Sequence, residues 1–147
     1  MESGKLLLIT GVSSGFGRAL AQEALAVGHR VVGTVRNAQA KQDFEALSTD
    51  KAFARTLDVT EFDAIGGVVA EIESNVGPID ILVNNAGYGH EGILEESPLS
   101  EMRRQFEVNV FGAVAMMKAV LPFMRERRRG NVRIIASVSR DVPHSGL

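Results

Sequence analysis

Short apolar runs alternate with helical stretches along the whole chain, and this alternation constrains the fold more than any other feature. Runs rich in Leu, Ile and Val that end at glycine or polar residues predict β-strands, and they lie at residues 5–10, 29–35, 52–57, 79–83 and 132–136. Apolar residues recur at helical spacing in residues 18–27, 37–47, 60–76, 101–108 and 111–128. Strands that alternate with helices predict a parallel sheet with helices on both faces.

The length of the chain and the absence of a linker or repeat indicate one domain. A chain of 147 residues has the usual size of a single domain, and no linker or internal repeat divides it. We therefore predict one α/β domain over residues 1–147, with a doubly wound parallel sheet between two helix layers. Within it, Thr60 followed by Asp63 predicts a capping box at the start of the third helix, and Ser97 or Ser100 is expected to cap the fourth.

Composition excludes several classes of function. The chain has no cysteine, which removes disulfides, thiolate nucleophiles and Cys-ligated zinc. Its three histidines are scattered without metal-ligand spacing, so we expect no metal. A net charge of −2 gives no reason to expect nucleic-acid binding. We see no signal peptide and no apolar stretch near the roughly 20 residues that span a bilayer, so we expect a cytoplasmic protein with no membrane contact.

A glycine cluster between the first strand and the first helix is the strongest chemical signal. Glycine there permits a tight turn and a close approach of backbone to a phosphate, which the free N–H groups of the helix N-terminus attract. The spacing is G-x-x-x-G-x-G rather than G-x-G-x-x-G, and no lysine follows as in a P-loop. The alternative is a glycine-rich turn without a ligand. The cofactor-binding residues predicted here are Gly11, Ser13, Ser14, Gly15, Phe16 and Gly17.

The end of the second strand distinguishes between the two nicotinamide cofactors. An acidic residue there would bind the ribose hydroxyls of NAD, but the segment Thr34-Val35-Arg36-Asn37 contains none. The guanidinium of Arg36 can instead pair with a 2′-phosphate, and Arg18 could help from the other side. The sequence therefore favours NADP(H) over NAD(H). The alternative for Arg36 is an ordinary exposed arginine.

Four further segments complete a family pattern. They are Leu57-Asp58-Val59-Thr60, Asn84-Asn85-Ala86-Gly87, Asn109-Val110-Phe111-Gly112 and Ser137 after the last apolar run. With the glycine cluster, they match the order and spacing of motifs in the short-chain dehydrogenase/reductase family, which the whole chain resembles. The resemblance implies a Rossmann-type fold and hydride transfer between a nicotinamide and a small alcohol or carbonyl substrate. It also implies a homo-oligomeric full-length form.

The resemblance also implies a role for each matching residue. Asp58 and Val59 would contact the adenine, and the cofactor would also be bound by Asn85, Ala86 and Gly87. Asn109 would help to organise a proton relay. Ser137 would hydrogen-bond the substrate carbonyl, with Ser139 as a nearby alternative.

One motif of the family is not found in the sequence. The family uses a Tyr-x-x-x-Lys pair about 13 residues after the serine, whereas Tyr88 is the only tyrosine here and Gly92 stands four residues after it. Tyr88 is at most a substrate-pocket residue. We therefore expect the N-terminal part of a longer enzyme, with its C-terminal strands missing. In that case the fifth strand is an unpaired edge and residues 113–124 expose an apolar patch. The alternative is a non-catalytic dinucleotide-binding module or sensor.

The first prediction concerns turnover. The tyrosine and lysine would carry the proton transfer, so the 147-residue chain is expected to show no measurable reduction of carbonyl compounds by NADPH. Spectrophotometric assay of the purified chain against a panel of ketones and aldehydes tests this. Reproducible NADPH consumption that depends on the carbonyl compound would contradict it.

Overall fold

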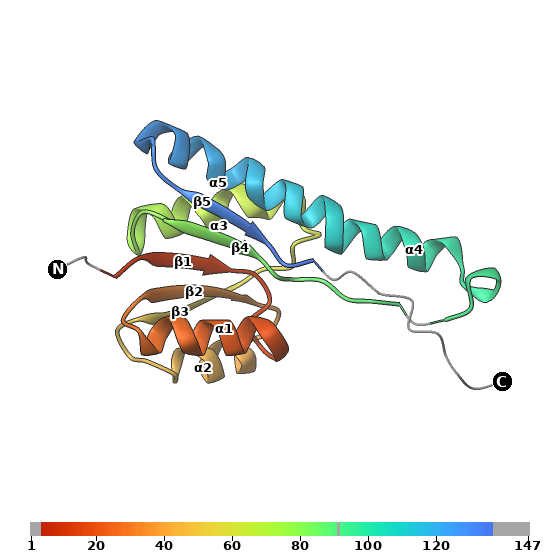
Figure 1. The fold of residues 1–147 in the computed structure, drawn as a ribbon, viewed down its shortest axis with the longest axis horizontal. Coiled ribbons are helices and arrows are strands. Elements are labelled where there is room, and N and C mark those ends of the chain that lie inside the picture. The colour runs from red at the N-terminus through yellow and green to blue at the C-terminus, as the bar shows by residue number, and fades with distance from the viewer. Residues whose placement is uncertain (1–3, 91, 137–147) are drawn as a thin grey trace.

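A five-stranded parallel sheet forms the centre of the structure (Figure 1). The structure is a computed structural model that describes residues 4–90 and 92–136. The strand order is β3-β2-β1-β4-β5, so the chain starts in the middle of the sheet and winds out in both directions. This confirms the Rossmann-type doubly wound α/β fold, with each predicted strand present. The strands are β1 (Leu6–Ile9), β2 (Arg30–Val35), β3 (Ala52–Thr56), β4 (Ile81–Asn84) and β5 (Asn131–Ile134).

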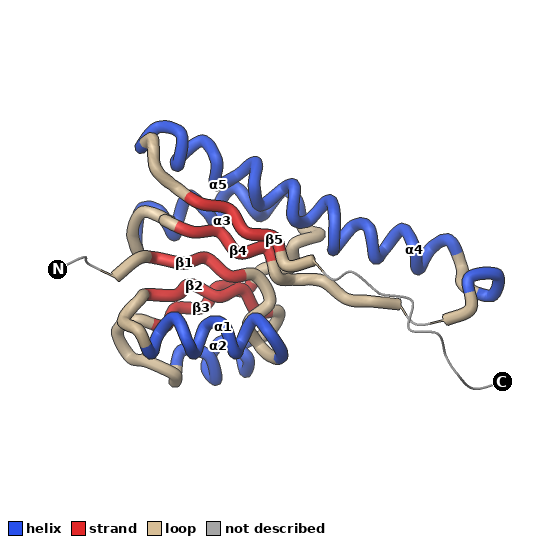
Figure 2. Tube along the Cα trace, viewed as in Figure 1, coloured by secondary structure: helices blue, strands red, loops and turns tan. Residues whose placement is uncertain are grey.

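Helices cover both faces of the sheet, which gives the predicted three layers. Helices α1 and α2 lie on one face, and α3 and α5 lie on the other (Figures 1 and 2). A short 3₁₀ turn, Leu94–Glu96, precedes α4, which projects beyond the sheet. The helices are α1 (Gly15–Ala26), α2 (Ala38–Glu45), α3 (Phe62–Asn75), α4 (Leu99–Phe106), the π-helical segment η2 (Glu107–Gly112) and α5 (Ala113–Arg127).

The central strand β1 shows why its sequence is continuously apolar. Leu6 and Leu8 pack into a core cluster with α3 and α5, whereas Leu7 and Ile9 pack into a second cluster with α1 and α2. Successive side chains of a strand point to opposite faces. Because each face of this sheet is covered by helices, both sets must be apolar, as is typical of parallel sheets.

Two predicted helices are in fact one continuous helix. We expected a break near residues 109–110, but α4, η2 and α5 run without interruption over Leu99–Arg127. The π-helical turns of η2 span the expected break, so the helix continues through Asn109. A Cβ at position 112 would lie 2.7 Å from Cγ2 of Val59, so glycine allows the helix to approach the β3–α3 loop closely.

Both predicted serine and threonine caps are wrong. Glu61 is the N-cap residue of α3, with no side-chain capping bond, because the Thr60 hydroxyl donates to Asp58 instead. Pro98 is the N-cap residue of α4, so Ser100 lies inside the helix, and the Ser97 hydroxyl donates to the carbonyl of Ile93. In each case the hydroxyl donates to a neighbouring acceptor outside the helix and makes no capping bond to a helix N–H group.

The long helix is far more exposed than its composition suggests. Met116, Val120 and Met124 of α5 are buried against the sheet, but α4 has no buried residue. The apolar exposure expected for residues 113–124 is present and also extends through α4 and η2. The exposed large apolar side chains of this helix are Leu99, Met102, Phe106, Val110, Phe111, Val114 and Leu121.

The long helix also contradicts our expectation that no apolar stretch approaches the length that spans a bilayer. It is 29 residues long and contains an 18-residue window of mean hydropathy 1.4, of which 17% is buried. By length and composition alone it could cross a membrane, and a single such helix is weak evidence. We expected two shorter helices over this segment and therefore did not identify one apolar helix of this length. The strand β5, as expected, is at one edge of the sheet.

A partly buried ion pair joins α5 to α3 at the end of the sheet opposite the glycine cluster. The Arg127 guanidinium donates to both carboxylate oxygens of Glu73, at 2.8 and 3.0 Å, and to the carbonyl of Ile79 at 2.9 Å. The Glu73 side chain is only 8% exposed. It also accepts from the backbone N–H of Ile79. The pair therefore connects α3, the start of β4 and the end of α5.

We predict that Arg127→Met destabilises the chain by about 3 kcal/mol, because it leaves the Glu73 carboxylate buried without its cation. Urea denaturation followed by circular dichroism measures the change. The matched control is Arg125→Met, since Arg125 is exposed on the same helix and its loss is expected to cost under ~0.5 kcal/mol. Equal denaturation midpoints for the two variants would contradict the role of the pair.

Candidate functional site

A cavity of about 1070 Å³ lies at the carboxyl ends of the strands. This is the edge where ligands bind in doubly wound sheets, and the volume is at the upper end for small-molecule and cofactor sites. Most of the residues predicted for cofactor binding meet here. The predicted residues that line the cavity are Gly11, Ser13, Ser14, Gly15, Phe16, Arg36, Asp58, Val59, Asn85, Ala86 and Gly87, and Tyr88 lines it as well.

The glycine cluster forms the turn that the sequence predicts. Gly11 and Gly15 have φ of 71° and 61°, a backbone conformation that glycine adopts without strain. Helix α1 begins at Gly15, and the N-cap Ser14 makes no side-chain capping bond. Its first N–H groups are therefore available at the cavity, with the partial positive charge of the helix terminus.

Gly17 is a predicted cofactor-binding residue that does not line the cavity but supports the glycine turn that does. It is buried rather than among the lining residues. A Cβ there would collide with the carbonyl oxygen of Gly11 and the side-chain amide of Asn85. The third glycine thus allows α1 to pack closely on the loop. Arg18, the possible second cation, does not line the cavity.

Thr10 and Asn85 connect the glycine turn after β1 to the loop after β4, and these two segments form the floor of the cavity. The Thr10 hydroxyl oxygen accepts from the backbone N–H groups of Asn85 and Ala86, at 3.0 and 2.9 Å. The Asn85 amide in return donates to the carbonyls of Thr10 and Gly11, at 3.1 and 3.0 Å. Asn85 therefore fixes the backbone at the start of the glycine turn. Our sequence reasoning missed Thr10, although a threonine at the end of a buried strand was a usable signal.

Asn109 and Asn84, the other asparagines of the family motifs, also form hydrogen bonds with the backbone. The Asn109 side chain accepts from the N–H of Tyr88 at 3.0 Å and donates to its carbonyl at 2.8 Å, so it fixes the loop after Gly87. Asn84 is buried and donates to the carbonyl of Ala113 at 3.4 Å. Its Oδ1 has no hydrogen-bond partner among the residues that the structure describes. Ser137, the predicted catalytic serine, lies outside the described residues.

Asp58 is an ionised carboxylate at the cavity wall. Hydrogen bonds from the Thr60 backbone N–H, at 2.9 Å, and from its hydroxyl, at 2.7 Å, lower the pKa of Asp58 below its ordinary value of 3.8. Partial burial opposes this change in pKa, and the positive charges of Arg36 and Arg104 support it. One carboxylate oxygen, Oδ1, thus accepts both hydrogen bonds from Thr60, and two arginines contribute favourable electrostatic attraction to the charge of Asp58.

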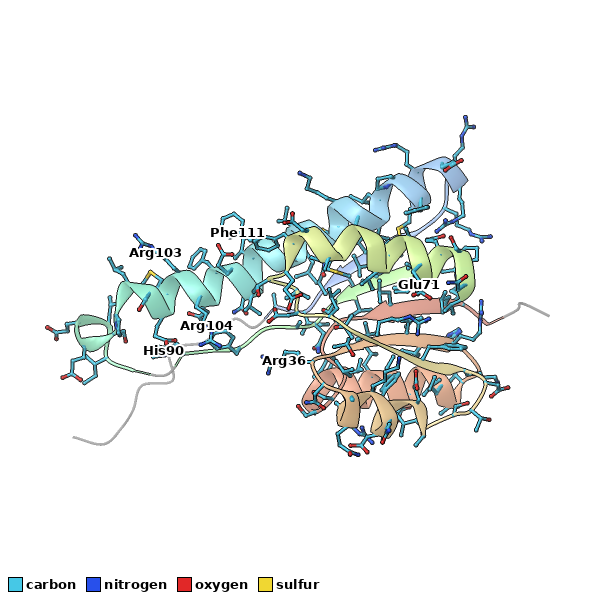
Figure 3. The ribbon with its side chains drawn as sticks, turned by 180° about the vertical axis from the view of Figure 1, so that it is seen from behind. Arg36, Glu71, His90, Arg103, Arg104 and Phe111 are labelled. Atoms are coloured by element: carbon cyan, nitrogen blue, oxygen red, sulfur yellow. The ribbon has the colours of Figure 1, made fainter. Side chains whose placement is uncertain are left out.

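A second wall of the cavity was missed by sequence reasoning. It comes from the long helix, which lies beside the carboxyl ends of the strands (Figure 3). No local pattern identifies these side chains, because only the tertiary path of the helix brings them to the site. The residues of this wall are Glu101, Arg104, Glu107 and Val108.

The sequence pattern and this geometry agree with a known family model. Residues 5–147 match the model described as short chain dehydrogenase. The chain belongs to the short-chain dehydrogenase/reductase family. This confirms the resemblance carried by the glycine cluster, Asp58 and the Asn84-Asn85-Ala86-Gly87 segment, and the family membership makes the chain part of an oxidoreductase family.

Individual members of the short-chain dehydrogenase/reductase family are similar over most of this chain. A 3-ketodihydrosphingosine reductase of Bacteroides thetaiotaomicron is 39% identical over 145 residues, covering 97% of this chain and 51% of that protein. The crystal structure of a short-chain dehydrogenase from Streptomyces avermitilis matches with a TM-score of 0.88 and 46% identity, covering 93% of this chain and 50% of that chain.

A third similar protein was solved with its ligands. The crystal structure of L-sorbose reductase from Gluconobacter frateurii, complexed with NADPH and L-sorbose, matches with a TM-score of 0.84 and 31% identity. The match covers 92% of this chain and 53% of that chain. The chain therefore spans about half the length of the relatives it matches.

We predict that Thr60→Val raises the pKa of Asp58, because the variant removes the hydroxyl donor. The pKa stays below the ordinary value because the backbone N–H of residue 60 still donates. Ionised Asp58 stabilises the fold fully above pH 3.8, and this contribution is lost as the pH falls through the lowered pKa. The variant therefore loses stability at neutral pH but not below both pKa values.

A carbon-13 NMR titration of the Asp58 carboxyl group measures this change. Thr56→Val is the control, since Thr56 is exposed at the end of β3. An Asp58 pKa that is the same in Thr60→Val and in the unmodified chain would show that the hydroxyl does not stabilise the carboxylate.

Proposed function

We propose that the chain is the nucleotide-binding part of an NADP(H)-dependent oxidoreductase that interconverts an alcohol and a carbonyl group on a small molecule. The family supports the reaction class. The single observation that supports the choice of NADP(H) is Arg36, which follows β2 and lines the cavity where an NAD-binding site would have an acidic residue.

The residues on the cavity floor fit a dinucleotide. The close packing at Gly17 and the positive φ of Gly11 and Gly15 leave a glycine turn with room for a phosphate group. The Ser13 and Ser14 hydroxyls and the α1 N-terminus supply donors and positive charge for a pyrophosphate. The adenine would lie against Val59 and near Asp58, whose free carboxylate oxygen can accept from an exocyclic amine.

In this proposal the residues of the chain bind and orient the cofactor and the substrate. A nicotinamide cofactor, when bound, supplies or accepts the hydride. The chain's own residues bind and orient it: the glycine turn binds the pyrophosphate, and Asn85 fixes that turn. Asn109 fixes the backbone at Tyr88, beside the predicted substrate pocket. Ser137 is proposed to hydrogen-bond the substrate oxygen.

The similarity to other proteins supports this proposal at the level of the cofactor class. The Gluconobacter reductase was solved with NADPH and a sugar substrate, and its fold matches this chain. The homo-oligomeric assembly and the cytoplasmic location stay predictions.

We predict that Arg36→Gln weakens NADPH binding by about tenfold or more and leaves NADH binding within about twofold. The reason is that a hydrogen bond to a charged group contributes roughly 1.5–3 kcal/mol, and 1.4 kcal/mol corresponds to a factor of ten. Isothermal titration calorimetry of the 147-residue chain measures both dissociation constants. The control Arg125→Gln changes an exposed arginine on α5 and is expected to alter neither. Equal affinity of the unmodified chain for NADPH and NADH would contradict the choice of NADP(H).

A further inference from the structure

Two arginines reach the cavity from different elements. Arg36 follows β2 at the edge of the sheet, and Arg104 is on α4 in the facing wall. In Figure 3 both side chains lie on the side of α4 that faces the sheet, whereas Arg103 projects from the opposite side of the helix. The neighbouring arginines 103 and 104 therefore belong to different surfaces.

The path of the long helix explains why Arg104 lines the cavity. Val108 lines the cavity and packs against the core cluster on the α3 face. Arg104 is four residues earlier and so lies on the same helix face, with its side chain directed toward the helix N-terminus. Asn109 and Gly112 fix η2 against Tyr88 and Val59. These contacts set the rotation of the helix, and with it the direction of Arg104.

The guanidinium groups of Arg36 and Arg104 make no ion pair or side-chain hydrogen bond within residues 4–90 and 92–136. Glu101 and Glu107 are three residues before and after Arg104 and also line the cavity, but neither forms an ion pair with it among the described residues. Both arginines are close enough to Asp58 to support its ionisation. An anion at this end of the cavity would thus meet cations from both walls.

We infer that Arg104 is a second cation for the adenosine 2′-phosphate, so that Arg36 and Arg104 bind this group from opposite walls of the cavity. This inference rests on the proposed function and assigns a specificity role to a residue outside the recognised motifs. A phosphate monoester carries a charge of about −1.5 to −2 at pH 7. Two guanidinium groups match that charge and offer planar pairs of donors.

The test compares Arg104→Gln with Arg103→Gln, a matched control one residue away on the other side of α4. Dissociation constants for NADPH and NADH are measured by isothermal titration calorimetry for the unmodified chain, both variants and Arg36→Gln. We expect Arg104→Gln to weaken NADPH binding about fivefold or more and to leave NADH within about twofold. We expect Arg103→Gln to change neither, and Arg104→Lys to recover part of the NADPH affinity.

The outcomes separate this inference from the proposed function. If Arg36→Gln weakens NADPH selectively but Arg104→Gln does not, the inference fails and the proposed function stands. Equal weakening of NADPH and NADH by Arg104→Gln would assign Arg104 to the adenine or pyrophosphate and overturn the 2′-phosphate role. A chain that binds NADH as well as NADPH would overturn both. Circular dichroism melts verify that the variants fold alike.

Discussion

The Thr10 hydroxyl is the interaction on which the rest of the site depends. Its oxygen accepts two backbone N–H groups at the end of β4, and the Asn85 amide completes the bond set between the two loops. Because β1 and β4 are neighbours in the sheet, this side chain extends their backbone pairing by two further hydrogen bonds beyond the carboxyl ends of the strands. These bonds fix the glycine turn to the loop after β4, and together the two segments form the cavity floor.

The strands and the glycine turn could be predicted because their causes are local. A strand that is buried on both faces must be apolar, as Leu6 to Ile9 are, and a turn with positive φ favours glycine, as at Gly11 and Gly15. Arg36 was found for a similar reason, since it directly follows a recognisable strand. These features need no knowledge of the tertiary path.

The parts that sequence reasoning missed depend on which segments meet in space. The Thr60 hydroxyl was expected to accept from the α3 N–H groups, but it donates to the Asp58 carboxylate, and Glu61 is the N-cap residue of α3. Arg104 carries no signal of its own, because Arg103 beside it has the same chemistry. Only the contacts of Val108 and Gly112 with the core and with Val59 distinguish the two positions.

The long helix therefore has two halves with different attachments. The α5 half is anchored by buried methionine and valine side chains and by the Arg127–Glu73 pair. The α4 half buries no residue, and its attachment to the body comes from hydrogen bonds to the carbonyl of Tyr88, donated by Gln105 near the end of α4 and by Asn109 in η2. The wall that carries Arg104 is thus positioned by hydrogen bonds at one end rather than by a core of its own. Its geometry relative to Arg36 depends on the same loop, residues 85–88, that the Thr10 hydroxyl fixes to the glycine turn.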